Sequence, residues 1–114
     1  MPRQKRKHDR INSLNLLNYV CLDDKGKDTN QGMGRTLNVS GGGILLETHV
    51  SLSPCSGISL SIGLEDEMID IIGSVIYCRK NRNDKYESGI EFSEINEIEQ
   101  KTLNKYIIAF REQH

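Results

Sequence analysis

GISLSIGLE, residues 57–65, alternates large apolar residues with serine and glycine. Its apolar positions are Ile58, Leu60, Ile62 and Leu64. A period of two is that of a β-strand with one face in a core and the other in solvent. The segment therefore predicts a half-buried strand, and we take it as the reference for the segments on either side.

Turn-rich stretches separate this segment from five others that are typical of strands. These are residues 14–22, 32–38, 43–50, 68–79 and 86–92. Residues 23–32, DDKGKDTNQG, are dense in Asp, Asn, Gly and Lys, so we expect an exposed hairpin loop there. Within residues 68–79 the period slips near Ile71, Ile72 and Gly73, which predicts a β-bulge or a sharp bend.

The C-terminal segment changes to a helical period. Residues 93–112 predict an amphipathic helix whose apolar side consists of Ile95, Ile98, Leu103, Tyr106, Ile107 and Phe110. Asn96 and Glu99 have the spacing of a capping box near its start. About six short strands followed by one helix favour a mainly β fold, a small antiparallel barrel or sandwich that the helix closes on one side.

The charge is distributed unevenly along the chain of 114 residues, a length that suits one compact domain. Residues 1–10, MPRQKRKHDR, carry five Lys and Arg against one Asp, a net charge of +4, whereas residues 11–114 carry −5. The first segment has almost no apolar content. We therefore expect a flexible basic arm at residues 1–10 and a folded domain at residues 11–112.

Several functional classes find no support in the sequence. No apolar run approaches the roughly 18 residues of a membrane helix, so we expect a cytoplasmic protein without membrane insertion. Cys21, Cys55 and Cys78 are far apart and form no metal or disulfide pattern, which favours free thiols. The three histidines are far apart and none has a neighbouring cysteine, so we expect no metal site. The sequence contains neither a phosphate-loop motif nor a G-x-S-x-G motif, and we therefore expect no enzyme activity and no cofactor.

Two short polar patterns remain. Arg6 and Arg10 lie four residues apart in the arm. One interpretation is a solvated basic tail. The other starts from the guanidinium group, which pairs bidentately with phosphate or with the O6 and N7 edge of guanine and stacks on bases. Two such groups on a flexible segment could grip one small anionic ligand, and a nucleotide is the natural candidate.

The second pattern is NVSGGG, residues 38–43, between two predicted strands. One interpretation is a tight turn in which glycine takes a positive φ. However, Asn38 and Ser40 alternate on one face of the strand end, and the glycines would let a ligand approach the backbone. Such a pattern suits a polar floor for a purine or a phosphate.

Taken together, R-K-H-D-R and, 27 residues later, N-x-S-x-x-G resemble the two-part signature of the PilZ domain, R-x-x-x-R followed by D/N-x-S-x-x-G. The resemblance covers nearly the whole chain. GGILLE looks like the strand after the second motif, and residues 86–107 look like the closing strand and helix.

The resemblance implies a six-stranded antiparallel β-barrel with a C-terminal helix that binds cyclic di-GMP. Arg6 and Arg10 would clasp phosphate and guanine, Asn38 and Ser40 would bond the ligand from the barrel, and Gly43 would keep the strand turn open. Further candidate contacts are Lys5, Arg3 and Gly42. Lys5 precedes the first arginine, a position thought to bear on whether one nucleotide or an intercalated pair binds.

The implied mechanism couples ligand binding to ordering of the arm. Ordering the five residues RKHDR would cost about 5 to 10 kcal/mol of backbone entropy, which only a ligand with several anionic and acceptor groups can offset. The chain would then act on an unidentified effector protein in trans. Two alternatives are a ligand-free protein-interaction adaptor and, less favoured, a nucleic-acid-binding barrel, because the body is acidic and has no interleaved aromatic and basic pattern.

Overall fold

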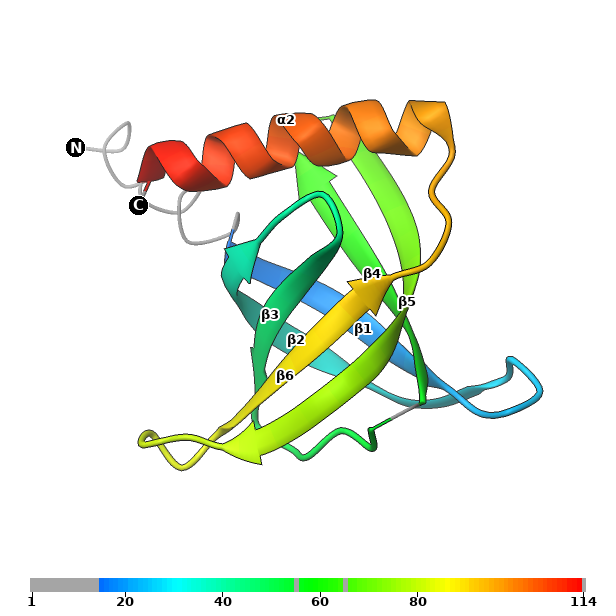
Figure 1. Cartoon of the computed structure of the whole chain (residues 1–114), viewed down its shortest axis with the longest axis vertical. Helices are drawn as coiled ribbons and strands as arrows, with labels where there is room; N and C mark the ends of the chain where they lie inside the picture. The colour runs from blue at the N-terminus through cyan, green and yellow to red at the C-terminus, as the bar shows by residue number, and fades with distance from the viewer. Residues whose placement is uncertain (1–14, 55, 65, 114) are drawn as a thin grey trace.

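The computed structural model describes residues 15–54, 56–64 and 66–113. Within these residues the chain forms six strands and one helix (Figure 1). They are β1 (Leu16–Leu22), β2 (Asp28–Val39), β3 (Gly43–Thr48), β4 (Gly57–Leu64), β5 (Glu67–Lys80), β6 (Tyr86–Phe92) and α2 (Glu97–Gln113).

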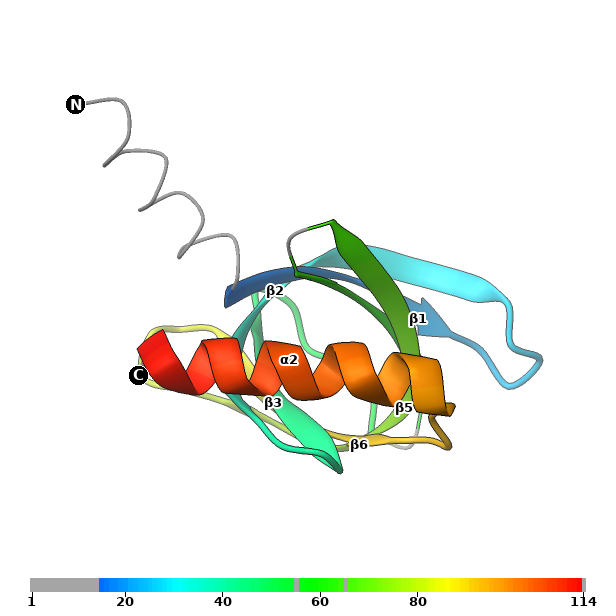
Figure 2. The same cartoon turned by 90° about the horizontal axis from the view of Figure 1, so that it is seen from above.

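The strands form a closed barrel in the order β1-β2-β3-β6-β5-β4, and each neighbouring pair is antiparallel. The helix α2 lies across one open end of this barrel (Figure 2). The predicted six-stranded antiparallel barrel with a C-terminal helix is therefore confirmed. Of the two architectures that the periodicity allowed, the chain adopts the barrel and not the sandwich.

Alternating side chains fill the barrel. Ile58, Leu60 and Ile62 of β4 are fully buried, as the period of two predicted. Leu103 and Tyr106 of α2 close the core from one end, and the Tyr106 hydroxyl lies 2.9 Å from Thr36 Oγ1 inside the barrel. Each buried aliphatic side chain stabilises the fold by about 1.5 to 3 kcal/mol.

The helix begins later than the sequence predicted. Asn96 is its N-cap, because the Glu99 N–H donates to Asn96 Oδ1 (2.8 Å) and the Asn96 N–H donates to Glu99 Oε1 (3.4 Å). This confirms the capping box, and it places residues 93–95 before the helix. The expectation that Ile98 packs on the apolar side is wrong, since this residue of the first turn is 77% exposed.

The predicted loop at residues 23–32 is shorter than expected. Asp23 Oδ1 accepts hydrogen bonds from the N–H groups of Lys25 and Lys27 (2.9 Å each), and Gly26 has φ +78°. The turn therefore closes within five residues, and Leu22 already pairs with Asp28. The polar residues that follow the turn lie in an exposed extension of β2, because strand pairing does not require apolar side chains.

The predicted bulge near Ile71 is wrong in position. Pairing of β5 with β4 is regular from Glu67 to Ser74, and inward positions stay buried as far as Val75. The register shifts against β6 instead, between Val75 and Tyr77. The two successive apolar residues at 71–72 need no bulge between them. Ile71 is buried, and Ile72 lies on the outer face, where it is 46% exposed.

Candidate functional site

A β-bulge at Leu37 turns the polar end of β2 outward. Thr36 pairs with Leu46 of β3 and Asn38 pairs with the next residue, Leu45, so Leu37 has no partner of its own in the ladder. A regular ladder would place Asn38 on the inward face with Thr36. Because of the extra residue, Val39 is buried instead, and Asn38 faces solvent together with Ser40.

The side chains of Asn38 and Ser40 are oriented by local hydrogen bonds. The Val39 N–H donates to Asn38 Oδ1 (2.9 Å), which directs the amide NH₂ group of Asn38 away from the backbone. The Gly42 N–H donates to Ser40 Oγ (3.3 Å), and the Ser40 N–H donates to the Gly43 carbonyl (2.9 Å). The site therefore offers donors on the outer surface of the barrel.

The three glycines after Ser40 serve different purposes. The interpretation that they need a positive φ is wrong, because Gly26 is the glycine with positive φ in the described part of the chain. A Cβ on Gly43 would overlap the carbonyl oxygen of Ile90, so β6 can approach β3 only if residue 43 is glycine. Gly41 and Gly42 have open space where a Cβ would point, so a ligand can approach the turn closely there.

These residues border a shallow pocket on the outer face of β2, β3, β6 and β5. Its volume is about 450 Å³. A second bulge, at Ile76, forms its other side, since Val75 pairs with Ile90 and Tyr77 pairs with Gly89. The residues whose side chains or backbone line it include Asn38, Ser40, Gly42, Gly43, Ile76, Tyr77, Gly89 and Glu91.

Tyr77 supplies an aromatic surface that the sequence analysis did not identify. Its ring lies over Gly89, where any side chain would overlap it, and it is 42% exposed. Arg79 Cζ lies 5.8 Å from the ring centroid, within the range of a cation–π contact. Two signals pointed here: consecutive apolar residues at 75–77, and a glycine within the strand at residue 89.

The structure brings together the barrel half of the predicted site and leaves the arm half outside its description. Asn38, Ser40, Gly42 and Gly43 all line the pocket. The predicted arm contacts, Arg3, Lys5, Arg6 and Arg10, belong to residues 1–14, which lie outside the described residues.

Between residues 15 and 113, apart from the two undescribed positions, no three His, Cys, Asp or Glu side chains are grouped as a metal site would require. Over that range no helix is long and apolar enough to cross a membrane. Cys21 belongs to the buried core, and this burial raises the pKa of its thiol.

Comparison with known proteins extends these observations. The family model named PilZ domain matches residues 4–109. Solved structures with the same fold include the inhibitor of motility MotI/DgrA from Bacillus subtilis (21% identity, TM-score 0.63, covering 86% of this chain and 48% of that chain). Another is the PilZ domain with c-di-GMP of YcgR from Escherichia coli (8% identity, TM-score 0.62, covering 85% of this chain and 83% of that chain). No curated protein sequence matches the chain.

Proposed function

The chain belongs to the PilZ domain family, and from this premise we propose that it is a receptor for cyclic di-GMP that signals to a partner protein in trans. The observation that carries the proposal is that Asn38, Ser40 and the Tyr77 ring meet at one outward-facing pocket. A structural neighbour of similar size is a PilZ domain with c-di-GMP, which supports the same ligand class here.

The pocket offers a distinct interaction to each part of such a ligand. The Asn38 NH₂ group is placed to bond an acceptor atom of a base or a phosphate. The Ser40 hydroxyl donates to the Gly43 carbonyl over a long 3.5 Å, a bond that an acceptor atom of the ligand would replace. The ring of Tyr77 offers a stacking surface, and stacking of a base on an aromatic ring contributes about 1 to 3 kcal/mol. The open backbone at Gly41 and Gly42 lets a ligand approach without a steric barrier.

The negative charge of Glu91 determines which part of the ligand can lie beside it. Its carboxylate is exposed at the pocket and would repel a phosphate, whereas it can accept hydrogen bonds from the N–H groups of guanine. We therefore place a guanine base over Tyr77 and Glu91, and the phosphates toward Ser40. This orientation leaves the phosphates on the side that needs positive charge from elsewhere in the chain.

We assign this positive charge to the N-terminal arm. We propose that residues 1–10 supply Arg6 and Arg10, with Lys5 and Arg3 as further contacts, to a domain that spans residues 11–112. The arm carries a net charge of +4, which complements a dianionic ligand. Ligand binding would order the arm against the barrel and change the surface that a partner meets.

Isothermal titration with cyclic di-GMP tests this function, with linear di-GMP and GTP as control ligands. We expect saturable binding that prefers the cyclic ligand and that weakens by about 1 to 3 kcal/mol in Arg10→Ala or Arg6→Ala, the scale of a bidentate guanine contact. Lys101→Ala on the exposed face of α2 is the matched control and should bind like the wild type. Absence of heat at high ligand concentration would favour the adaptor alternative.

A further inference from the structure

The connection between β5 and β6 concentrates positive charge on an acidic barrel. We call residues 79–85, RKNRNDK, the basic hairpin. Its four Lys and Arg against one Asp give it a net charge of +3, whereas residues 11–114 together carry −5, so the remainder of that range carries −8. An exposed cluster of this kind attracts anions over roughly a Debye length of 10 Å.

The basic hairpin is held in one shape by Asn81. Asn81 Oδ1 accepts hydrogen bonds from the N–H groups of Asn83 (2.9 Å) and Lys85 (3.1 Å). The Asn81 N–H also donates to the Lys85 carbonyl (2.8 Å), and Asp84 takes a positive φ of 63° to complete the turn. A loop with these internal bonds loses little conformational entropy when a partner binds.

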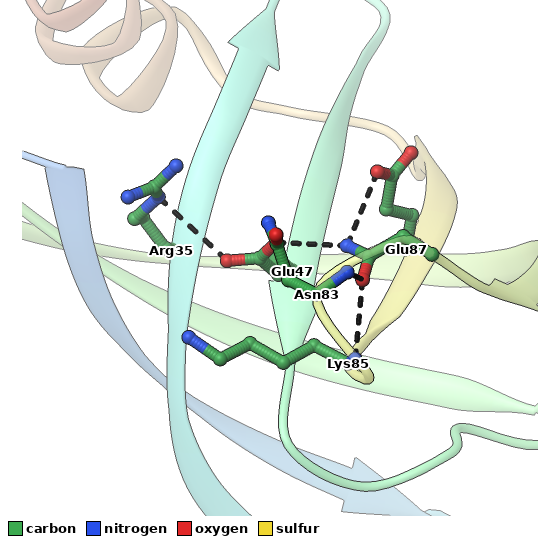
Figure 3. A network of polar contacts seen from close by, with 6 residues as sticks. Arg35, Glu47, Asn83, Lys85 and Glu87 are labelled. Atoms are coloured by element: carbon green, nitrogen blue, oxygen red, sulfur yellow. Dashed lines mark hydrogen bonds and ion pairs between the residues drawn. The ribbon is translucent and has the colours of Figure 1, made fainter.

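The same asparagine ties the hairpin to the barrel. Arg35, Glu47, Glu87 and Arg79 are direct cross-strand neighbours on β2, β3, β6 and β5, so two like charges stand side by side between two cations. Asn81 Nδ2 bridges the two carboxylates, donating to Glu47 Oε2 (2.8 Å) and Glu87 Oε2 (3.2 Å). Figure 3 shows Arg35, Glu47 and Glu87 of this network, with Asn83 and Lys85 of the hairpin beside them.

Two cations of the basic hairpin, the exposed Arg82 and the half-buried Lys85, remain available to a partner. Among the described residues, Arg82 and Lys85 make no ion pair, and the Lys80–Asp84 pair at 2.8 Å is exposed at both ends. Exposed pairs of this kind contribute at most about 1 kcal/mol, so a partner can displace them. Beside them lies an open pocket of about 720 Å³, lined by Arg79, Lys80, Asn81, Arg82, Asn83 and Glu87.

We propose that the basic hairpin is a docking site for an acidic segment of a partner protein. Guanidinium groups bind carboxylates bidentately, and the side-chain amide of Asn83 adds donors beside them. A nucleic acid fits less well. A long polyanion would extend from the +3 hairpin onto the rest of residues 11–114, which carries a net charge of −8 and would repel it. A short acidic segment meets only the hairpin.

The basic hairpin lies beside the pocket that we assign to the nucleotide. Tyr77 of the pocket and Arg79 of the hairpin are two residues apart on the same face of β5, about 7 Å along the strand. A partner docked on the hairpin would therefore touch the rim of the pocket that we assign to the nucleotide. The docking proposal itself does not depend on nucleotide binding, since the hairpin is held by the barrel alone.

The test is a titration of the isotope-labelled protein with a short glutamate-rich peptide, followed through its backbone amide resonances. We expect saturable shifts at residues 79–87, and a Kd roughly three- to tenfold weaker in the double variant R82Q/K85Q, because each exposed charge contact is individually small. The control K101Q/R111Q removes the same charge from α2, where both side chains are exposed. It should bind the peptide like the wild type.

Three outcomes would overturn the proposal. They are shifts centred away from residues 79–87, equal weakening in the two double variants, and tighter binding of a thymidine oligonucleotide of equal net charge at the hairpin. A parallel titration with cyclic di-GMP separates the two proposals. R82Q/K85Q should leave nucleotide binding unchanged, because neither residue lines the pocket beside Asn38.

Discussion

Two connections at opposite ends of the paired strands β3 and β6 are built in opposite ways. The turn between β2 and β3 consists of Ser40, Gly41 and Gly42, and it carries few side-chain atoms. The hairpin between β5 and β6 is crowded with charged side chains that Asn81 holds in place. The first connection leaves backbone and space open for a ligand, and the second presents a preformed charged surface. The difference shows that one barrel can carry an open, accommodating connection at one end of β6 and a rigid one at the other.

The largest test of this comparison concerns the glycines of the turn. Gly43→Val should lower the free energy of unfolding by at least about 3 kcal/mol, because its Cβ would overlap the carbonyl of Ile90 in the neighbouring strand. Gly42→Ala, with open space at the same point, should change stability by less than about 0.5 kcal/mol. Urea denaturation of both variants measures the difference. Equal losses would mean that the turn is not open at residue 42.

The hairpin provides the next test. Asn81→Ala should destabilise the protein by about 2 kcal/mol, because it leaves Glu47, which is only 6% exposed, without its hydrogen-bond donor. Asn83→Ala removes an exposed side chain and should be nearly neutral. Thermal unfolding of the pair measures the effect. If the two variants unfold alike, the side chain of Asn81 does not brace the hairpin.

Between the two connections lies Tyr77, which tests the proposed ligand. Tyr77→Leu should weaken cyclic di-GMP binding by about 1 to 2 kcal/mol, because it removes the stacking surface and keeps an apolar side chain over Gly89. Tyr77→Phe keeps the ring and should bind almost as the wild type does. Calorimetric titration of the three proteins decides between stacking and simple packing. Equal affinity in all three would remove Tyr77 from the site.

The smallest expected effect concerns Glu67, whose carboxylate is exposed, in contrast to that of buried Glu47. Hydrogen bonds from Lys105 (3.0 Å) and Thr102 (2.8 Å) lower the pKa of Glu67, which anchors α2 to β5. A lowered pKa stabilises the fold above the ordinary pKa of glutamate, and the stabilisation is lost as pH falls through the lowered value. Wild type should therefore be slightly more stable than Glu67→Gln at neutral pH, and the difference should vanish in acid. A constant difference across that range would contradict this linkage.

Much of this architecture follows from local patterns, and the exceptions have a common cause. The alternation at residues 57–65 and the capping box at Asn96 depend on neighbouring residues, so the strand and the helix start could be recognised from the sequence. The bulges at Leu37 and Ile76 depend on how β2 and β5 meet partners far along the chain. For that reason the sequence predicted Asn38 and Ser40 for the site but missed Tyr77, which only the second bulge turns outward beside them.

The closure of the barrel limits how a partner protein can bind. Where a strand pairs with a neighbour on each side, no backbone edge is free for a partner to add a strand of its own. In the described part of the chain β2 departs from this, because residues 28–34 pair with β1 and pairing with β3 begins only at Arg35. Elsewhere on the barrel wall a partner has to recognise side chains, so a few surface substitutions can change which partner binds.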